Sequence, residues 1–405
     1  MIRPSMSGSS VTSLDEIPRD EAHDHAAASA LSLKAGARER NGAIDALRAA
    51  VTLLVVLHHT AITYGASGGW YYKEVLPSKS LDSLLLILFT ATNQAWFMGL
   101  FFLLAGYYTP PALQRHGTAG FVRERLLRLG VPLAFYFFIL SPFTVALALT
   151  AKELSFVRVL PWLWRNGRFE PGPLWFVEAL LIFTAVWLVW RRTRKPQTVA
   201  RVAFPSDMIL LAAALVTGLV AFLLRFIWPV GVNVGFLQLG YFASYSVLFA
   251  AGCAAADQKW LEQIPQDRKR RWLRIAWWAF PVFPVVVLVG SRVSWLHGPP
   301  EGGFNLQALV YAFWEPFVAW GFILGLLTFF QRRFAQLGGV WPMLARRAFL
   351  IYIVHPPIVV GVALAWGDVT APALVKFLVT GSLACALCYV IAGLLLRIPG
   401  VARIV

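Results

Sequence analysis

Two adjacent histidines, His58 and His59, end an apolar run that also carries Arg48, eleven residues before His59. In an α-helix eleven residues rise about 16 Å and complete about three turns, so Arg48 and His59 share one face while His58 points elsewhere. An imidazole can take a proton from a hydroxyl or carry an acyl group, and a guanidinium fork suits phosphate oxygens. The alignment favours a functional role for His59, whereas for His58 a structural role stays equally open.

Three further ionisable residues, Glu178, Glu315 and His355, also lie inside apolar runs. An ionisable group at bilayer depth costs at least a few kcal/mol, which makes it a candidate for function. Their spacing does not reveal whether they converge on His59. Because a neighbouring group can activate a histidine for proton transfer, Glu178, Glu315 and His355 are candidates to act with His59, and His58 is a further candidate.

An arginine cluster, Arg123, Arg125 and Arg128, follows the second apolar run. Arg125 and Arg128 are three residues apart and are predicted to share a helical face. Guanidinium groups suit phosphate oxygens, which makes the cluster a candidate for binding a phosphate-bearing ligand. Taken alone, however, the cluster is better interpreted as one that sets membrane topology.

The composition indicates what must position these residues. Of the 405 residues 58% are hydrophobic and only 14% are charged, with a mean hydropathy of +0.65. Soluble domains are about half apolar and a quarter charged. A bilayer accommodates such a chain, and it demands helices because each backbone polar group must be satisfied within its own segment. We therefore predict an all-α polytopic membrane protein.

Ten apolar runs are long enough to cross a bilayer as helices. They lie at residues 44–65, 82–107, 128–150, 173–190, 207–228, 237–256, 273–291, 306–330, 343–366 and 372–396. We predict that they form one bundle within a single domain, residues 41–405. Residues 1–40 are rich in Ser, Ala and charge, which predicts a disordered cytoplasmic tail. The Cys385-x-x-Cys388 pair lies inside an apolar run and is interpreted as helix packing.

The net charge of +16 is unevenly distributed among the loops. Alternate loops carry most of the Arg and Lys, at residues 115–128, 191–201, 259–274 and 332–347. By the positive-inside rule these loops and both termini are cytoplasmic, and we expect the cell (inner) membrane. The basic residues form short tracts between apolar runs, which argues against a nucleic-acid partner.

Two of the opposite loops, Tyr64–Ser80 and Ala151–Pro173, are rich in aromatic residues mixed with Asn, Arg and Glu. Such surfaces bind sugar rings by stacking and hydrogen bonding. An interfacial aromatic belt explains the same composition, and the two interpretations are equally open.

The chain also resembles the acyltransferase-3 family of integral membrane acyltransferases. The resemblance rests on the Arg48-to-His59 helix, FFLLAGY at 101–107, Arg125-x-x-Arg128, LWFVEALL at 174–181 and YIVH at 352–355, in the expected order from Asn41 almost to the C-terminus. Many relatives have Ser before the Gly of the second motif, where this chain has Ala105, so no role is carried to that position.

The resemblance implies O-acyl transfer from cytoplasmic acyl-CoA to a carbohydrate on the opposite face, as in O-antigen, glucan or peptidoglycan modification. His59 would be the catalytic histidine, Glu178 a supporting acid, and Arg48 with the Arg125/Arg128 pair would serve the donor. Acetyl and succinyl are the natural acyl groups. No bound cofactor or metal is expected beyond acyl-CoA as cosubstrate, and the oligomeric state stays open.

Two other classes fit buried histidines and carboxylates. One is a proton-coupled transporter, and the other is a flippase or assembly scaffold without catalysis. Transporters often contain an internal repeat, and none is visible here. Together with the alignment of Arg48 and His59, this favours the enzyme.

Overall fold

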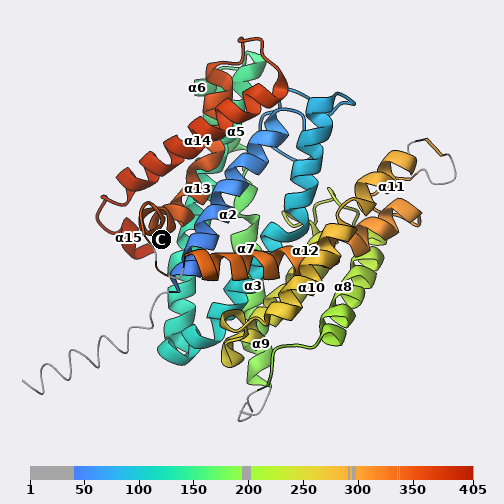
Figure 1. Ribbon diagram of the computed structural model, residues 1–405. Coiled ribbons are helices and arrows are strands. Elements are labelled where there is room, and N and C mark those ends of the chain that lie inside the picture. The colour runs from blue at the N-terminus through green and yellow to red at the C-terminus, as the bar shows by residue number, and fades with distance from the viewer. Residues whose placement is uncertain are drawn as a thin grey trace, which may run out of the picture. The chain divides into compact units, whose positions relative to one another are not determined.

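The computed structural model describes residues 41–193, 202–290, 292–293, 298–334, 336 and 338–404. The predicted tail at residues 1–40 lies outside the described residues. From Gly42 onward the described chain forms one helical unit (Figure 1). No strand occurs in these described ranges, where only two isolated bridges join loop residues. The all-α prediction is therefore confirmed.

Within the described ranges nine helical segments are long and apolar enough to cross a membrane. One of them, Leu81–Lys152, has 72 residues. At 1.5 Å per residue that is several times the roughly 30 Å of a bilayer core, so it must cross more than once. It covers the predicted runs 82–107 and 128–150, and each of the other eight matches one predicted run. The chain is a multi-pass membrane protein.

The segments have the following bounds. The long helices are α2 (Gly42–Thr63), α3 (Leu81–Arg125), α7 (Trp175–Arg192), α8 (Asp207–Ile227), α9 (Phe242–Gln258), α10 (Gln266–Ala279), α12 (Leu306–Arg333), α13 (Trp341–Ala365) and α14 (Ala373–Leu395). The shorter ones are α4 (Val131–Phe135), α5 (Ser141–Leu149), α6 (Phe156–Arg165), α11 (Val282–Gly290) and α15 (Val401–Ile404). Single turns of π or 3-10 helix, η1 to η6, connect several of them; η5 (Leu239–Tyr241) leads into α9.

Helix α3 contains the turn between the second and third crossings. It starts at the N-cap Ser80, whose side chain accepts a hydrogen bond from the Ser83 amide. Two helices meet within it at Gly117, whose φ of 63° is favourable only for glycine. The chain changes direction at this kink, and the following helix continues through η1, the π-helical segment Leu126–Gly130, whose flanking residues are α-helical. Arg123 and Arg125 therefore lie at the end of the bundle that carries the basic loops.

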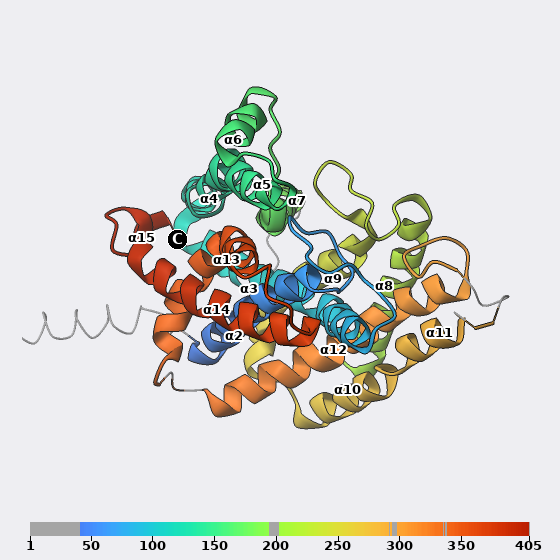
Figure 2. The same cartoon turned by 90° about the horizontal axis from the view of Figure 1, so that it is seen from above.

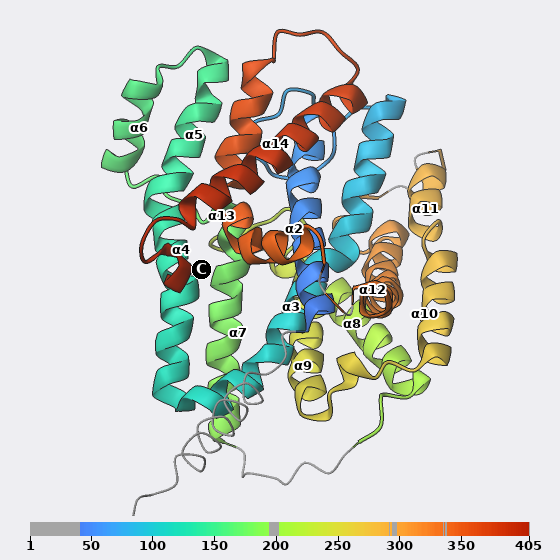
Figure 3. The same cartoon turned by 60° about the vertical axis from the view of Figure 1, so that its left-hand side comes forward.

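Helix α2 lies at the centre of the bundle. It packs against α3, α12, α13 and α14 (Figures 2 and 3). Among the described spans, α2 and α12 have the most buried apolar windows, and the α10–α11 segment has the least buried one. A central helix can carry polar side chains, because other helices shield them from lipid. The histidine-bearing helix therefore occupies the position where a reactive polar group costs least.

Two glycines allow α3 and α9 to pack closely. A Cβ atom at Gly106 would lie 2.2 Å from the Phe249 carbonyl oxygen, and one at Gly252 would lie 2.0 Å from the Leu103 carbonyl oxygen. Neither position has room for a side chain, so the backbones themselves are in contact. Both glycines therefore serve helix packing.

Candidate functional site

The centre of the candidate site is a hydrogen-bonded histidine pair. His59 of α2 and His355 of α13 approach with 3.0 Å between His59 Nδ1 and His355 Nε2. The other nitrogen of His355, Nδ1, lies 2.7 Å from the Tyr352 carbonyl oxygen. Of the candidate partners predicted for His59, the structure thus brings His355 into direct contact.

A proline explains why the Tyr352 carbonyl can bind the His355 ring. In an α-helix this carbonyl would accept from the backbone N–H four residues later, which is Pro356 and has no N–H. The freed carbonyl accepts from the His355 side chain instead. The sequence His355-Pro356 therefore fixes the orientation of the imidazole from within its own helix.

The hydrogen bonds also assign the protons of the neutral pair. A carbonyl oxygen only accepts, so His355 Nδ1 carries its proton and His355 Nε2 is left as an acceptor. His59 Nδ1 must then donate to that acceptor. The remaining nitrogen, His59 Nε2, holds an unshared electron pair. The arrangement orients His59 as a base.

An aromatic side chain covers the pair. Trp70, from the loop between α2 and α3, stacks on His59 at 4.2 Å between ring centroids and 14° between planes. It is also nearly parallel to His355, at 5.9 Å. Its indole Nε1 is buried and has no hydrogen-bond partner among the described residues. This loop thus turns its tryptophan inward, onto the histidines, instead of displaying it as a surface platform.

Several contacts hold that loop in place. Glu74 forms a buried ion pair with Lys376 of α14, and Lys376 Nζ also donates to the Gly367 carbonyl at 3.0 Å. The Tyr71 hydroxyl lies 3.0 Å from that of Tyr136. Burial raises the pKa of the Glu170 carboxyl, and a hydrogen bond with Tyr71 opposes that rise. These contacts fix the backbone that follows Trp70.

In the second aromatic loop, by contrast, Trp162 and Trp164 belong to α6 and are about half exposed. They remain candidates for either a sugar platform or an interfacial belt.

His58 points away from its neighbour, as the helical spacing predicts. Its ring packs on Phe97 of α3 at 4.9 Å and meets His59 edge-on at 5.5 Å. His58 Nδ1 is buried without a partner among the described residues. Its role in catalysis stays a prediction.

The two predicted carboxylates lie in different surroundings. Glu178 of α7 is half-buried, and its Oε2 has no hydrogen-bond partner in the described part of the chain. The turn directly before its helix, η4 (Gly172–Leu174), is joined to α13, where the Tyr352 hydroxyl donates to the Pro173 carbonyl. Glu315 is engaged elsewhere, in a buried ion pair with Arg225 of α8. Among the described residues, therefore, no carboxylate is hydrogen-bonded to the histidine pair.

The arginines predicted to bind the donor lie towards the other end of the bundle. Arg48 is 43% exposed and forms an ion pair with Asp45 at 3.3 Å. Arg125 is half-buried, and its Nη2 donates to the Thr109 hydroxyl at 3.1 Å. Helices α2 and α3 are antiparallel, and His58 contacts Phe97 between them. Arg48 lies ten residues before His58 and Thr109 lies twelve residues after Phe97, so Arg48 and Thr109 are at about the same level along the bundle axis.

Arg125 and Arg128 have different environments. Arg128 is exposed and forms an ion pair with Glu124 at 3.3 Å. The chain after Arg125 is the π-helical turn η1, so the α-helical spacing used to place both arginines on one face does not apply there. Arg123 faces an open, mostly apolar hollow of about 740 Å³, which it lines together with Arg192 and Leu127.

The family follows from comparison with known proteins. The acyltransferase-3 family model, described as an acyltransferase domain, matches residues 41–393. The chain belongs to this family. No curated protein and no solved structure gave a match. As a member of the acyltransferase-3 family, this chain is a membrane acyltransferase.

Sequence patterns did not identify three residues of this acyltransferase that the structure places at the histidine pair or in buried ion pairs. They are Trp70, Lys376 and Arg225. Lys376 and Arg225 each interrupt an apolar run, and a charged residue in such a run is a usable signal. Near a helix end, however, such a residue is easily interpreted as one whose charged group reaches the membrane interface. For Trp70 no signal distinguishes a ring that stacks inward from its aromatic neighbours.

Proposed function

We propose that this acyltransferase moves an acyl group from cytoplasmic acyl-CoA to a hydroxyl of a glycan on the opposite side of the membrane. The observation that carries the proposal is the His59–His355 pair, whose hydrogen bonds leave His59 Nε2 without a proton inside a bundle of helices. A base of this kind suits the deprotonation of an alcohol. Acetyl and succinyl are the acyl groups that we would test first.

The reaction proceeds in two steps, addition and elimination. His59 Nε2 takes the hydroxyl proton of the acceptor while the hydroxyl oxygen bonds to the thioester carbonyl carbon. The tetrahedral intermediate then breaks its carbon–sulfur bond, and His59 returns the proton to the departing CoA thiolate. His355 Nε2 accepts from His59 Nδ1 throughout, which stabilises the imidazolium that forms between the two steps.

The donor enters from the end of the bundle that carries the arginines. Arg48 and Arg125, with Arg128 and Arg123 nearer the surface, hold its phosphates. The extended pantetheine arm separates those phosphates from the thioester. This fits the distance of about 16 Å that eleven helical residues place between Arg48 and His59. Glu178 stays a candidate for positioning the acceptor.

The test uses the purified protein in nanodiscs with radiolabelled acetyl-CoA and alkali-deacylated envelope glycan. His59→Ala should lower transfer by at least about 100-fold while acetyl-CoA still binds, because only the base is lost. Arg48→Ala should weaken acetyl-CoA binding, because a phosphate contact is lost. His116→Gln, at an exposed histidine on α3, is the matched control and should retain activity.

A fully active His59→Ala protein would refute the mechanism. Label retained on wild-type protein in the absence of glycan, and lost in the His59 variant, would show instead that His59 carries the acyl group. Glycan flux into proteoliposomes without consumption of acetyl-CoA would support the transporter.

A further inference from the structure

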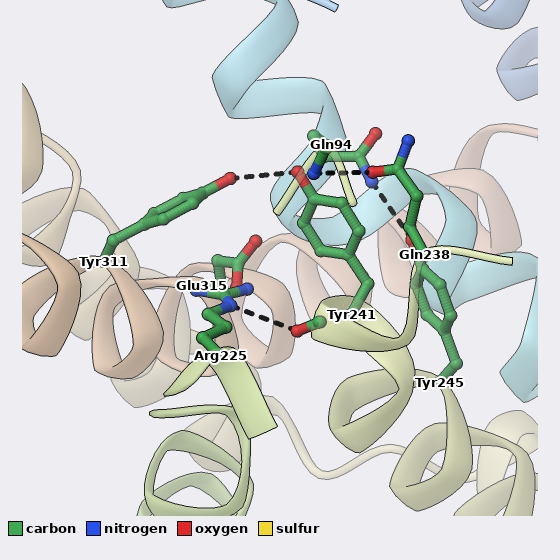
Figure 4. Close-up of polar contacts among 9 residues, drawn as sticks. Gln94, Arg225, Gln238, Tyr241, Tyr245, Tyr311 and Glu315 are labelled. Atoms are coloured by element: carbon green, nitrogen blue, oxygen red, sulfur yellow. Dashed lines mark hydrogen bonds and ion pairs between the residues drawn. The ribbon is translucent and has the colours of Figure 1, made fainter. Parts of the chain in front are cut away.

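A second buried polar cluster lies among α3, α8, α9 and α12, outside the histidine pair. We call it the Arg225 cluster; its members are Arg225, Glu315, Tyr241, Tyr245, Tyr311 and Gln94 (Figure 4). Arg225 is fully buried near the end of α8, and Glu315 is 3% exposed on α12. The two form an ion pair, and Arg225 Nε donates to the Gly240 carbonyl at 3.1 Å.

Aromatic rings and amides complete this cluster. The Arg225 guanidinium lies 4.6 Å from the Tyr311 ring centroid and 5.5 Å from that of Tyr241. The hydroxyls of these two tyrosines are 3.4 Å apart. Gln94 of α3 donates to the Tyr245 hydroxyl at 3.0 Å. Segments far apart in the chain thus direct hydrogen-bonding groups to one place.

The cluster has hydrogen-bonding capacity that the described residues do not use. Arg225 Nη1 is buried and has no partner among them, although the arginine itself is 0% exposed. Asn93 Nδ2, on the turn of α3 that carries Gln94, is unpartnered in the same sense. A buried donor without an acceptor costs about 1–3 kcal/mol, so a purely structural ion pair would leave this cost unrecovered. A ligand oxygen would recover it.

The charges of the cluster indicate the kind of ligand. Arg225 and Glu315 neutralise each other, so no unpaired cation is left for a carboxylate or phosphate. The remaining groups are phenol hydroxyls, amides, a guanidinium N–H and aromatic faces. These suit a neutral compound with several hydroxyl groups, which both donates and accepts hydrogen bonds and can stack on rings.

The cluster lies beside the histidines along α3. Asn93, Gln94 and Phe97 occupy one face of this helix about 100° wide, and Phe97 packs directly on His58. Gln94 therefore lies about 4.5 Å along the helix axis from the residue that contacts the histidine segment. Gln94 and Tyr241 are only partly buried, so the polar surface is reachable from outside the core.

From these observations we infer that the Arg225 cluster is an acceptor subsite, which holds a neutral, hydroxyl-rich part of the glycan while another hydroxyl meets His59. This inference rests on the proposed function. It assigns Arg225, Tyr241 and Gln94 to acceptor recognition, and not to the donor or to the proton transfer.

The experiment compares acceptor kinetics in hydroxyl and amide deletions that leave the ion pair intact. Tyr241→Phe and Gln94→Leu should each raise the KM for deacylated glycan by about tenfold, the effect of one lost hydrogen bond. The kcat and the KM for acetyl-CoA should stay within about twofold of wild type. Tyr389→Phe, which removes a hydroxyl on α14 next to Met343, is the matched control and should change neither constant.

Defined oligosaccharides test the predicted neutrality. Glucose or N-acetylglucosamine oligomers should compete with the glycan better than oligogalacturonate, and the two variants should lose that preference. An unchanged acceptor KM in both variants would overturn the subsite, as would a fall in kcat alone accompanied by lower thermal stability. If the wild-type protein transfers no acetyl group to any glycan, the proposed function itself fails, which is a different result.

Discussion

At the residue scale, reactivity depends on which ring nitrogens carry protons. Pro356 has no backbone N–H, so the Tyr352 carbonyl accepts a hydrogen bond from His355 Nδ1 instead, and His355 Nε2 in turn accepts one from His59 Nδ1. Each step follows from the donors and acceptors available. Trp70 covers the pair and limits its contact with water, which strengthens hydrogen bonds between the rings.

This chain of contacts makes His355 a positioning residue, which two substitutions can test. His355→Gln offers an amide oxygen to His59 Nδ1, whereas His355→Leu offers none. We expect the Leu variant to lose about 100-fold in kcat and the Gln variant to lose clearly less, with the KM for acetyl-CoA unchanged in both. Steady-state kinetics on the purified variants measure this. Equal losses in the two, with equally lowered thermal midpoints, would indicate a structural role only.

At the element scale, close backbone contact and a buried ion pair decide where the site's helices and loop lie. Gly106 and Gly252 allow α3 and α9 to touch, and α3 carries Phe97 against His58. The pair of Glu74 and Lys376 fixes the loop that carries Trp70 to α14. Each of these contacts joins segments that are far apart in the sequence.

Gly106→Ala should destabilise the protein by about 1–3 kcal/mol, because the new methyl group would overlap the Phe249 carbonyl at 2.2 Å. Gly130→Ala is the control, since the nearest atom to its Cβ lies 3.8 Å away on Leu126. Thermal unfolding in detergent compares the two. Equal midpoints for both variants would contradict the close contact of α3 and α9.

Lys376→Met should destabilise the fold by about 3–5 kcal/mol, because it leaves the Glu74 carboxylate buried without its cation. Activity should fall as well, since the Trp70 loop loses its anchor. The double variant Glu74→Gln with Lys376→Met should recover much of the stability, because no charge remains buried. A double variant no more stable than Lys376→Met would show that the ion pair does not act as a unit.

At the scale of the whole molecule, the bundle surrounds α2 with other helices and places basic loops at one end. Arg225 and Lys376 lie inside helices near the opposite end, and each is neutralised by a glutamate, so neither disturbs the charge difference between the two ends. This asymmetry is what orients a membrane protein during insertion.

Cysteine labelling tests the orientation. In a background with Cys253, Cys385 and Cys388 replaced by Ala, an impermeant thiol reagent applied to intact cells should label Lys152→Cys. It should label Arg270→Cys only after permeabilisation, because residues 259–274, which include this part of α10, belong to the basic set. Both positions are exposed, so accessibility in the folded protein does not limit either reaction. The reverse pattern would invert the proposed direction of acyl transfer.

Sequence alone was sufficient to predict the properties that depend on the local order of residues along the chain. Apolar run length gave the crossings, loop charge gave an expected orientation, and helical periodicity aligned Arg48 with His59. The ordered motifs also indicated the family, which the match over residues 41–393 confirms.

Tertiary structure decided which polar groups meet. His59 binds His355, 296 residues away in sequence, whereas Glu315 pairs with Arg225 and not with the histidines. Trp70 turns inward because its loop is fixed to another helix. Periodicity describes one face of one helix. Which helix packs against that face, and at what height, depends on the packing of the whole bundle.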